Sequence, residues 1–393
     1  MKIGIDISML VYKGSGVANY TYNLVKHLLL YDKKNEYRLF YSSLRRPKNF
    51  YYLKEFKKLG GKIYDYPFPP WMLNLWWNKF NIIPVEWFIG KVDYYFSSDF
   101  LRPPLLKGTK GITTIHDLTW KIFPQFHEEE IVKGHERKLE KTIKLNDIII
   151  VDSQNTKKDL LSHYPEILKT NKVEVIYPAI DPKFKKITDQ NKIKKILEKY
   201  NVQYPEKYLL YVGAIEPRKN LNTAIKIFHK LIIENKKLTT NNQRPATDHP
   251  TTNNRQLTTN LQFLIVGHAG WKNKEIFKLI KDLKLEKRVI IVGFVEDEDL
   301  VYFYNACQVF IYLSKYEGFG LPPLEAAACG KPTLLYNNSS LKEIFTKDYP
   351  YTAKNKEIET LKLLVNKNFN LNDYACEFTW KKYCSEFLKN LEL

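Results

Sequence analysis

Short apolar runs alternate with amphipathic segments along almost all of this 393-residue chain, and the alternation limits the folds that the chain can adopt. In one amphipathic segment Leu221, Ile225, Phe228 and Ile232 recur at the spacing of one helix face. Short strands separated by such helices are typical of parallel sheets with helices on both sides. The sequence therefore predicts an α/β protein, with strands near Lys2–Ile7, Tyr37–Tyr41, Val92–Phe96, Gly111–Ile115, Ile148–Val151, Tyr208–Val212, Phe263–Val266, Val289–Val292, Val309–Tyr312 and Thr333–Tyr336.

The chain is longer than one ordinary hydrophobic core accommodates, so we expect two Rossmann-like domains that face each other across a cleft. The turn-rich segment Tyr177–Pro182 is the expected hinge. We expect a first domain over residues 1–176, a second over 177–372, and a C-terminal helix over 373–393 that crosses back to the first domain. Residues 238–260 are rich in Thr, Asn and Gln and lack the apolar residues of a core, which predicts a disordered insert.

The chain is strongly basic, with 62 Lys and Arg residues against 43 Asp and Glu residues and a formal net charge of +19. Nucleic acid, anionic lipid and phosphorylated substrates are the partners that such a charge favours. The 4 cysteines form no Cys-x-x-Cys motif, which disfavours a disulfide scaffold or a cysteine-ligated zinc site. No signal-peptide pattern precedes the first strand, and no apolar run reaches the roughly 18 residues of a spanning helix. We therefore expect a cytoplasmic protein.

The segment Glu317–Glu325 follows the predicted strand 309–312 and combines glycines, prolines and two carboxylates. Gly318 and Gly320 allow a sharp turn and close approach of the backbone to a ligand. The prolines suit the first turn of a helix, and Gly330 suits its end. N–H groups at the start of this helix, near Leu321, could bind phosphate, and the last Glu of the segment is expected in the first helical turn. The alternative is a surface Glu and a Glu favoured by the helix dipole.

The segment 317–332 resembles the signature of retaining nucleotide-sugar glycosyltransferases of family 4, also called glycosyl transferases group 1, which have the GT-B fold. Further segments resemble motifs of that family and occur in the family's order: Ser98–Pro103, Ile115–Asp117, Tyr211–Asn220, Leu264–Gly267, Val292–Val295 and Phe378–Trp380. The resemblance covers nearly the whole chain outside residues 238–260 and is strongest to mannosyltransferases of the family.

The resemblance implies roles for individual residues. Glu325 would bind the ribose of the donor nucleotide, and Glu317 would bind hydroxyls of the donor sugar. Arg218 and Lys219 would neutralise the diphosphate, which develops negative charge as it leaves; alternatively, they form a solvated turn. The whole set of expected donor-binding residues is Gly16, Gly213, Arg218, Lys219, Phe294, Val295, Glu317, Gly318, Phe319, Gly320, Leu321 and Glu325.

His116 completes the expected catalytic set, together with Glu317, Arg218 and Lys219. It follows a predicted strand, at the carboxyl end where α/β proteins bind ligands. The resemblance implies contact with the donor sugar or its diphosphate. The alternative is a structural histidine, with Asp117 as the cap of a helix or turn.

Neither a cofactor nor a metal is expected. The loop that begins at Gly14 imitates a dinucleotide fingerprint, but Asn19 occupies the position of the third glycine, and no acidic residue follows the second strand. Asp297 and Asp299 match an Asp-x-Asp metal motif, but they precede a predicted helix, which predicts capping and dipole complementation instead. Ala18 and Ala214 differ from the residues that many members of the family have.

The expected function is retaining transfer of a sugar, with mannose as the best single candidate, from a nucleoside-diphosphate sugar. The acceptor would be a glycan or a polyprenyl-linked glycan in surface polysaccharide or glycolipid synthesis. One alternative keeps the GT-B fold but catalyses phosphorolysis or epimerisation. Another is a basic nucleic-acid-binding protein, which lacks a recognisable motif here and leaves the Glu317–Glu325 segment unexplained.

Four tryptophans lie close together in the first half, next to a basic stretch: Trp71, Trp76, Trp77 and Trp87, with Arg45, Arg46, Lys48, Lys54, Lys57, Lys58 and Lys62. A basic helix beside an aromatic-rich segment suits an anionic membrane surface. The alternative is that the aromatic residues are core and the lysines are solvated. We expect peripheral association with the cytoplasmic face of a membrane.

Overall fold

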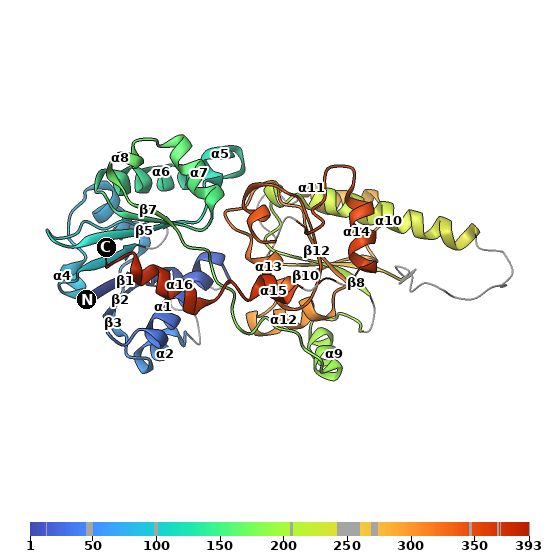
Figure 1. The fold of residues 1–393 in the computed structure, drawn as a ribbon, viewed down its shortest axis with the longest axis horizontal. Coiled ribbons are helices and arrows are strands. Elements are labelled where there is room, and N and C mark those ends of the chain that lie inside the picture. Colours follow the sequence, from blue (N-terminus) through green and yellow to red (C-terminus); the bar gives the residue numbers. More distant parts are fainter. Residues whose placement is uncertain are drawn as a thin grey trace. The chain divides into compact units, whose positions relative to one another are not determined.

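The computed structural model describes residues 1–12, 14–44, 50–97, 101–204, 207–241, 260–268, 274–345, 348–367, 369 and 371–392. The chain forms two compact units, one of Met1–Asp181 with Phe378–Leu393 and the other of Pro182–Glu377 (Figure 1). The expected boundaries, after residues 176 and 372, lie a few residues before these. Each unit contains one parallel sheet, so the predicted α/β class with two Rossmann-like domains is confirmed.

The first unit has a parallel sheet with strand order β3-β2-β1-β4-β5-β6-β7. Its strands are β1 (Lys2–Asp6), β2 (Glu36–Ser42), β3 (Lys62–Tyr66), β4 (Tyr94–Ser97), β5 (Lys110–Ile115), β6 (Ile148–Val151) and β7 (Val173–Val175). Its helical segments are η1 (Ser8–Val11), α1 (Gly16–Tyr31), α2 (Tyr52–Lys58), α3 (Pro70–Leu73), η2 (Asn74–Lys79), α4 (Glu86–Ile89), α5 (Thr119–Ile122), η3 (Pro124–Phe126), α6 (Glu129–Lys144), α7 (Gln154–His163), α8 (Ile167–Thr170) and α16 (Trp380–Lys389).

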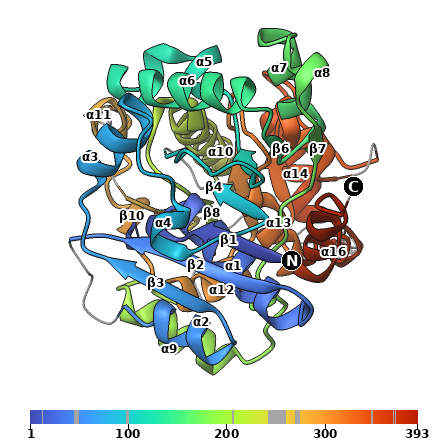
Figure 2. The same cartoon turned by 90° about the vertical axis from the view of Figure 1, so that its left-hand side faces the viewer.

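The helices of the first unit divide between the two faces of its sheet, with α5 and α6 on one face and α2 and α16 on the other (Figure 2). Neighbouring residues of a strand point to opposite faces. Leu39 packs in the core cluster that contains Phe56 of α2. Phe40 packs in the cluster that contains Trp77 of η2. The basic helix α2 and the tryptophan-rich segment therefore cover opposite faces, and the expectation that they lie side by side is wrong.

The four clustered tryptophans differ in exposure. Trp77 is completely buried and Trp76 is half-buried, so these two belong to the interior. Trp71 and Trp87 are 68% and 70% exposed. Two of the tryptophans are therefore core residues, and the other two are exposed on the surface. Residues 45–49, which contain three of the basic residues considered with this cluster, lie outside the described residues.

The C-terminal helix α16 belongs to the first unit, although the second unit precedes it in the chain. Trp380, Tyr383 and Phe387 are buried in the same core cluster as α1. The Trp380 ring stacks on His27 of α1, with 5.3 Å between the ring centroids. This helix therefore completes the hydrophobic core under β1.

The second unit has a parallel sheet with strand order β10-β9-β8-β11-β12. Its strands are β8 (Tyr208–Val212), β9 (Gln262–Val266), β10 (Val289–Gly293), β11 (Val309–Tyr312) and β12 (Thr333–Leu335). Its helical segments are α9 (Gln190–Lys199), η4 (Pro217–Lys219), α10 (Leu221–Asn241), α11 (Lys274–Asp282), α12 (Asp297–Ala306), α13 (Leu321–Ala328), η5 (Ser339–Glu343), α14 (Glu357–Asn366) and α15 (Asn372–Ala375).

The first residues of the expected insert, 238–241, are helical, because α10 continues to Asn241. Residues 242–259, where the rest of that insert falls, lie outside the described residues. In the part of the chain that the structure describes, no helix combines the length and apolar composition needed to cross a bilayer.

The strand order reverses beside the first strand of each sheet, between β1 and β4 and between β8 and β11. Ligands of α/β proteins bind at the carboxyl ends of the strands next to such a reversal. The two carboxyl edges are therefore the places to look for a site.

Candidate active site

Two loops meet at the carboxyl edge of the second sheet. The first follows β8 and contains η4, and the second connects β11 to α13. The Lys315 backbone N–H donates to the Arg218 carbonyl at 2.9 Å, and the Asn220 side chain donates to the Leu313 carbonyl at 3.1 Å. Asn220 has a φ of 58°, a left-handed conformation that asparagine tolerates better than most residues. These contacts hold both loops in one conformation.

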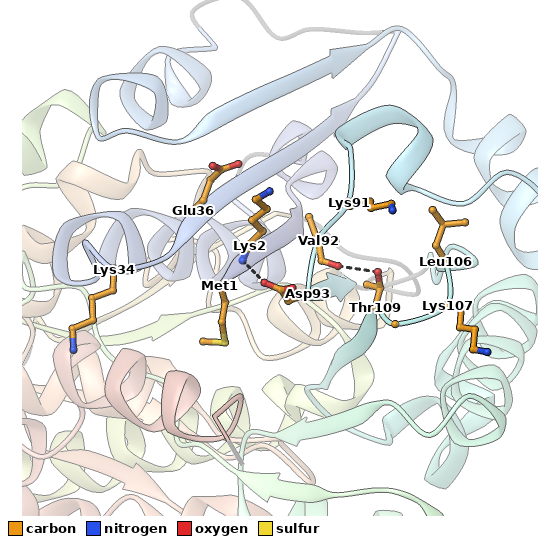
Figure 3. A pocket seen from close by; sticks show the side chains of 11 residues that line it. Met1, Lys2, Lys34, Glu36, Lys91, Val92, Asp93, Leu106, Lys107 and Thr109 are labelled. Atoms are coloured by element: carbon orange, nitrogen blue, oxygen red, sulfur yellow. Dashed lines mark hydrogen bonds between the residues drawn. The ribbon is translucent and has the colours of Figure 1, made fainter.

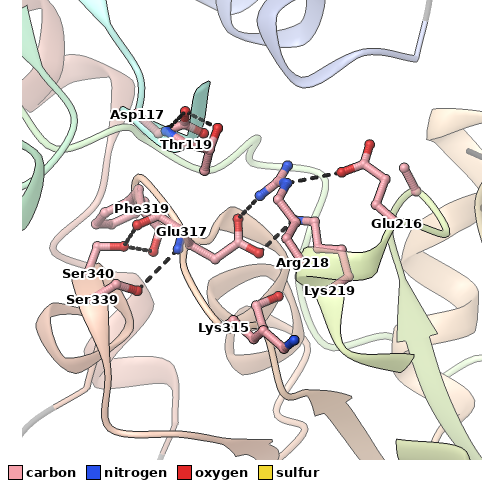
Figure 4. Close-up of polar contacts among 12 residues, drawn as sticks. Asp117, Thr119, Glu216, Arg218, Lys219, Lys315, Glu317, Phe319, Ser339 and Ser340 are labelled. Atoms are coloured by element: carbon pink, nitrogen blue, oxygen red, sulfur yellow. Dashed lines mark hydrogen bonds and ion pairs between the residues drawn. The ribbon is translucent and has the colours of Figure 1, made fainter. Parts of the chain in front are cut away.

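Glu317 binds both cations of the first loop (Figure 4). Its Oε1 accepts from Lys219 Nζ at 2.6 Å, and its Oε2 accepts from Arg218 Nη1 at 3.0 Å. Arg218 Nε also donates to Glu216 Oε2 at 3.0 Å, and Lys219 Nζ donates to the Tyr312 hydroxyl at 2.9 Å. The structure therefore joins three of the predicted catalytic residues in one charged cluster, and the interpretation of Arg218 and Lys219 as a solvated turn is wrong for Lys219, which is buried.

The electrostatics of this cluster favour an ionised Glu317. Burial opposes ionisation of Glu317, but the charges of Lys219 and Arg218 outweigh it and lower the pKa of its carboxyl to about 2. Burial and the charge of Arg218 lower the pKa of Lys219, while Glu317 raises it. A buried carboxylate held by two cations is a preorganised charge arrangement.

The turn after Glu317 is fixed by two serines that sequence reasoning missed. The Glu317 N–H donates to Ser339 Oγ at 3.1 Å, and Ser340 Oγ donates to the carbonyls of Glu317 and Phe319 at 2.8 and 2.9 Å. No sequence signal links this Ser-Ser pair to the Glu317 turn, because it lies in a separate segment, η5, after β12.

Gly320 must be glycine for steric reasons. It has a φ of 103°, and a Cβ at this position would lie 2.7 Å from the Leu341 Cδ2 atom. Leu321 then begins α13, with prolines in its first turn, as predicted. Gly330, with a φ of 74°, follows the end of the helix and donates to the Ala327 carbonyl at 2.8 Å, which confirms it as the helix terminator.

Glu325 lies in the second turn of α13, so its predicted place in the first turn is wrong. Gly320 is the N-cap, and the helix therefore begins only at Leu321. Because the helix dipole acts mainly within the first turn, it is a weaker reason for a Glu at this position. The Glu325 Oε2 atom accepts from the hydroxyl of Tyr304 on α12 at 2.8 Å, and Tyr304 is completely buried.

Three neighbouring strands of the second sheet end at glycines with positive φ: Gly213, Gly267 and Gly293. A Cβ on Gly267 would lie 2.1 Å from the Gly213 carbonyl oxygen, so the two loops approach as closely as their backbones allow. Phe294, which follows β10, stacks on His268 with 4.9 Å between ring centroids. Val295 is buried, so its side chain belongs to the interior.

His116 lies at the carboxyl end of β5 in the first unit. Its Nδ1 is 2.7 Å from Asp152 Oδ2, and the Tyr20 ring packs edge-on against the imidazole at 4.7 Å between centroids. Asp152 was not selected from the sequence, although a polar residue directly after a strand was the available signal. Asp117 Oδ1 accepts from the N–H and the hydroxyl of Thr119, which confirms Asp117 as the cap of a turn.

Gly16 is the first residue of α1. Its predecessor Ser15 is the N-cap and accepts from the Ala18 N–H at 3.2 Å. A Cβ on Gly16 would meet no atom within 4 Å, so packing inside the structure does not require glycine here. Gly16 and His116 belong to the first unit and all other predicted site residues to the second.

One of the acidic residues at the start of α12 binds side chains of the second unit. Asp299 Oδ2 accepts from Lys199 at 2.6 Å and from the Tyr200 hydroxyl at 2.8 Å. Asp297 and Asp299 lie in the first turn, where the helix dipole favours acids, but the capping expectation is wrong, because the N-cap is Glu296 and its side chain makes no capping hydrogen bond. Among the residues that the structure describes, no group of three or more His, Cys, Asp or Glu side chains could hold a metal ion.

In a comparison with known sequences, one family model matches the first half of the chain and another matches the second half. The model of Glycosyltransferase Family 4 matches residues 14–184, and the model of Glycosyl transferases group 1 matches residues 192–378. O-antigen chain mannosyltransferase B of Escherichia coli is 28% identical over 256 residues, which are 64% of this chain and 59% of that protein. Serotype-specific mannosyltransferase WbdA of Escherichia coli is 30% identical over 201 residues, which are 50% of this chain and 22% of that protein.

Solved structures support the fold. Sucrose-phosphate synthase from Thermosynechococcus elongatus superimposes with a TM-score of 0.67 at 16% identity, over 100% of this chain and 98% of that one. HepE from Anabaena, in complex with UDP and glucose, gives a TM-score of 0.64 at 14% identity, over 100% and 99% of the two chains. The predicted GT-B fold is therefore confirmed, and with a family model matching each half, this chain belongs to family 4 of the glycosyltransferases.

Proposed function

We propose that this protein is a retaining glycosyltransferase that moves a sugar from a nucleoside-diphosphate sugar to a glycan or polyprenyl-linked acceptor in surface polysaccharide or glycolipid synthesis. The observation that carries the proposal is the cluster of buried Lys219 and Glu317 with partly exposed Arg218, at the strand-order reversal of the second sheet. The mannosyltransferase names of its relatives make mannose the first candidate for the sugar.

The cluster suits departure of a nucleoside diphosphate. In the proposed reaction the bond between the anomeric carbon and the diphosphate oxygen breaks, and the acceptor oxygen bonds to that carbon on the same face. The acceptor's proton moves to a phosphate oxygen of the donor. Arg218 is the more exposed cation, with 18% of its side chain accessible against 9% for Lys219, so it would meet the diphosphate first. Both cations are already fixed by Glu317, and charge developing on the diphosphate therefore costs little reorganisation.

Two carboxylates would orient the donor. Each Glu317 oxygen accepts one hydrogen bond from a cation, and a carboxylate has about four lone-pair sites, which leaves acceptor capacity for sugar hydroxyls. Tyr304 orients Glu325 through one oxygen. We assign Glu325 to the ribose of the nucleotide.

A donor panel tests this function. A thermal-shift screen with UDP, GDP, ADP and their sugar conjugates should raise the melting temperature for one base, because a ligand that binds only the folded state stabilises it. Turnover should then release nucleoside diphosphate and form a glycoside of unchanged anomeric configuration. Glu325→Ala should lose the thermal shift, whereas Glu359→Ala, a control on the exposed start of α14, should keep it. Sugar phosphate or an epimerised donor as the product would support the phosphorylase or epimerase alternative instead.

The reaction is proposed to need neither a metal nor another cofactor, because protein cations would serve the diphosphate. Excess EDTA should leave turnover unchanged. Loss of activity that manganese restores would contradict metal independence.

We also propose that the first unit binds an anionic membrane surface. A depression of about 490 Å³ at the amino-terminal edge of the sheet is bordered by lysines (Figure 3): Lys2, Lys34, Lys91 and Lys107, with Glu36 and Asp93 as its acids. Exposed Trp87 follows Glu86 in the chain, and Glu86 accepts from the N–H of Leu106, a residue of this rim, at 3.0 Å. A tryptophan beside lysines suits a lipid headgroup region.

Liposome binding tests the membrane proposal. Binding should require anionic lipid and weaken with salt. The double variant Lys91→Glu/Lys107→Glu should bind much more weakly, since each basic residue near the surface contributes about 1 kcal/mol. Lys57→Glu/Lys58→Glu, on α2 and outside the lining of the depression, is the matched control. Binding that ignores lipid charge, or equal loss in both variants, would contradict the proposed surface.

A further inference from the structure

The parallel pairing of β5 and β6 places His116 opposite Asp152. Ile115 pairs with Val151 in this register, and His116 and Asp152 are the next residues along the two strands. The turn after Asp152 is fixed, because Ser153 caps α7 and accepts from the Thr156 N–H at 3.0 Å. The strand register and the capped turn therefore place the Asp152 carboxylate next to the His116 imidazole.

The contact determines which ring nitrogen carries the proton. His116 Nδ1 lies 2.7 Å from Asp152 Oδ2. An ionised carboxylate only accepts hydrogen bonds, so Nδ1 must be the donor. In the neutral ring Nε2 then carries the lone pair. The His116 side chain is 25% exposed and that of Asp152 is 8% exposed, so the histidine remains accessible while its partner is enclosed.

Tyr20 holds the ring from a second side. Its hydroxyl contacts Thr114 at 3.2 Å and also bonds to Tyr383 of α16. The Tyr20 and His116 rings meet at 82°, an edge-to-face arrangement. A rotation of the imidazole would lose both the hydrogen bond to Asp152 and this packing.

The Asp152 carboxylate has features that lower the free energy of unfolding. Its Oδ1 atom is buried and has no hydrogen-bond partner among the described residues. Burial raises the pKa of this carboxyl, and His116 opposes the rise. A buried carboxylate with one oxygen unpaired costs free energy that an apolar side chain would avoid. Such a cost indicates a role other than holding the fold together.

We propose that Asp152 is a positioning residue that fixes the tautomer and the orientation of the His116 imidazole, so that Nε2 is the nitrogen that meets the donor. The catalytic part of this inference rests on the proposed function. The claim that Asp152 fixes the tautomer and orientation of the imidazole does not rest on the proposed function. It can be measured without any turnover.

The experiment compares Asp152→Asn with Asp117→Asn, a matched control that removes a neighbouring carboxylate bound to Thr119. The ¹⁵N chemical shifts of His116 should show a proton on Nδ1 in the wild type and in Asp117→Asn. In Asp152→Asn the amide can donate to Nδ1, and the proton should move to Nε2. Wild-type protein with the proton on Nε2, or no change in Asp152→Asn, overturns the proposal.

Turnover and stability give the second readout. Asp152→Asn should lower kcat/KM roughly tenfold or more, the usual scale for losing a partner that orients a reactive group. Its melting temperature should not fall, because the amide keeps a hydrogen bond to His116 and carries no charge whose burial costs free energy. A fall in melting temperature that accounts for the lost turnover would make Asp152 a merely structural residue and overturn the proposal. His116→Ala at wild-type turnover would overturn the catalytic part, whereas absence of transfer with every donor would refute the proposed function and leave the tautomer result standing.

Discussion

Lys219 Nζ lies 2.6 Å from Glu317 Oε1, although the two residues are 98 positions apart in the sequence. Their side chains are 9% and 7% exposed, so the pair is removed from water. Removing one member of such a pair leaves the other charge buried. Single substitutions here therefore change stability and ligand binding together, and experiments on this site must separate the two.

A double substitution separates them. Lys219→Met and Glu317→Gln should each destabilise the second unit by roughly 3–5 kcal/mol, the usual cost of breaking a buried ion pair. The double variant should be more stable than either single variant, because no uncompensated charge remains from this pair. Its sugar transfer should still be lost. Chemical denaturation gives the stabilities, and additive losses would contradict the coupling.

Acid should weaken the second unit through Glu317. The pKa of this carboxyl is lowered from 4.5 to about 2 in the folded protein. A depressed folded-state pKa stabilises the fold at pH values above the unfolded pKa, and this contribution disappears as pH falls from about 4.5 toward 2. The stability gap between wild type and Glu317→Gln should therefore be widest near neutral pH and shrink below pH 4. Denaturation at several pH values checks this, with Glu359→Gln as a surface control that should show no such gap; a gap that does not depend on pH would refute it.

Glycine at 267 should be far less replaceable than glycine at 293. Both have positive φ, which costs a residue with a side chain about 1–2 kcal/mol. Gly267→Ala would also push Cβ to 2.1 Å from the Gly213 carbonyl oxygen, whereas Gly293→Ala meets nothing within 4 Å. Thermal denaturation should show a much larger loss for Gly267→Ala. Equal losses would mean that the two loops do not approach as closely as described.

Trp380→Ala should destabilise the first unit, although residue 380 follows the second unit in the chain. The Trp380 side chain is 4% exposed in the core of the first unit, and truncation of a buried tryptophan costs roughly 3–5 kcal/mol. Hydrogen exchange should show lost protection in β1 and none lost in β8. Lys381→Ala is the control, because residue 381 is exposed. Lost protection centred on β8 would contradict the assignment of α16 to the first unit.

Sequence patterns located most strands well. The strands β6, β8 and β11 begin and end as expected, because each is a buried apolar run between polar turns. The edge strand β3 was missed, because its charged residues Lys62 and Asp65 interrupt the apolar pattern. The helix containing Glu325 was predicted with the correct start, prolines and terminating glycine, but Glu325 is its fifth residue and lies in the second turn and not in the first.

The amino-acid sequence by itself determined the α/β class and the two-domain organisation, and it selected Arg218, Lys219 and Glu317 as candidate site residues, because strand periodicity and turn residues act over a few positions. Only the tertiary structure decided that Glu317 holds both cations, that two serines of η5 hold its turn, and that Asp152 meets His116. Strand register and loop packing bring these groups together across long stretches of chain. Hydrogen bonds of this kind depend on ångström-scale distances in space, and local sequence patterns do not encode such distances.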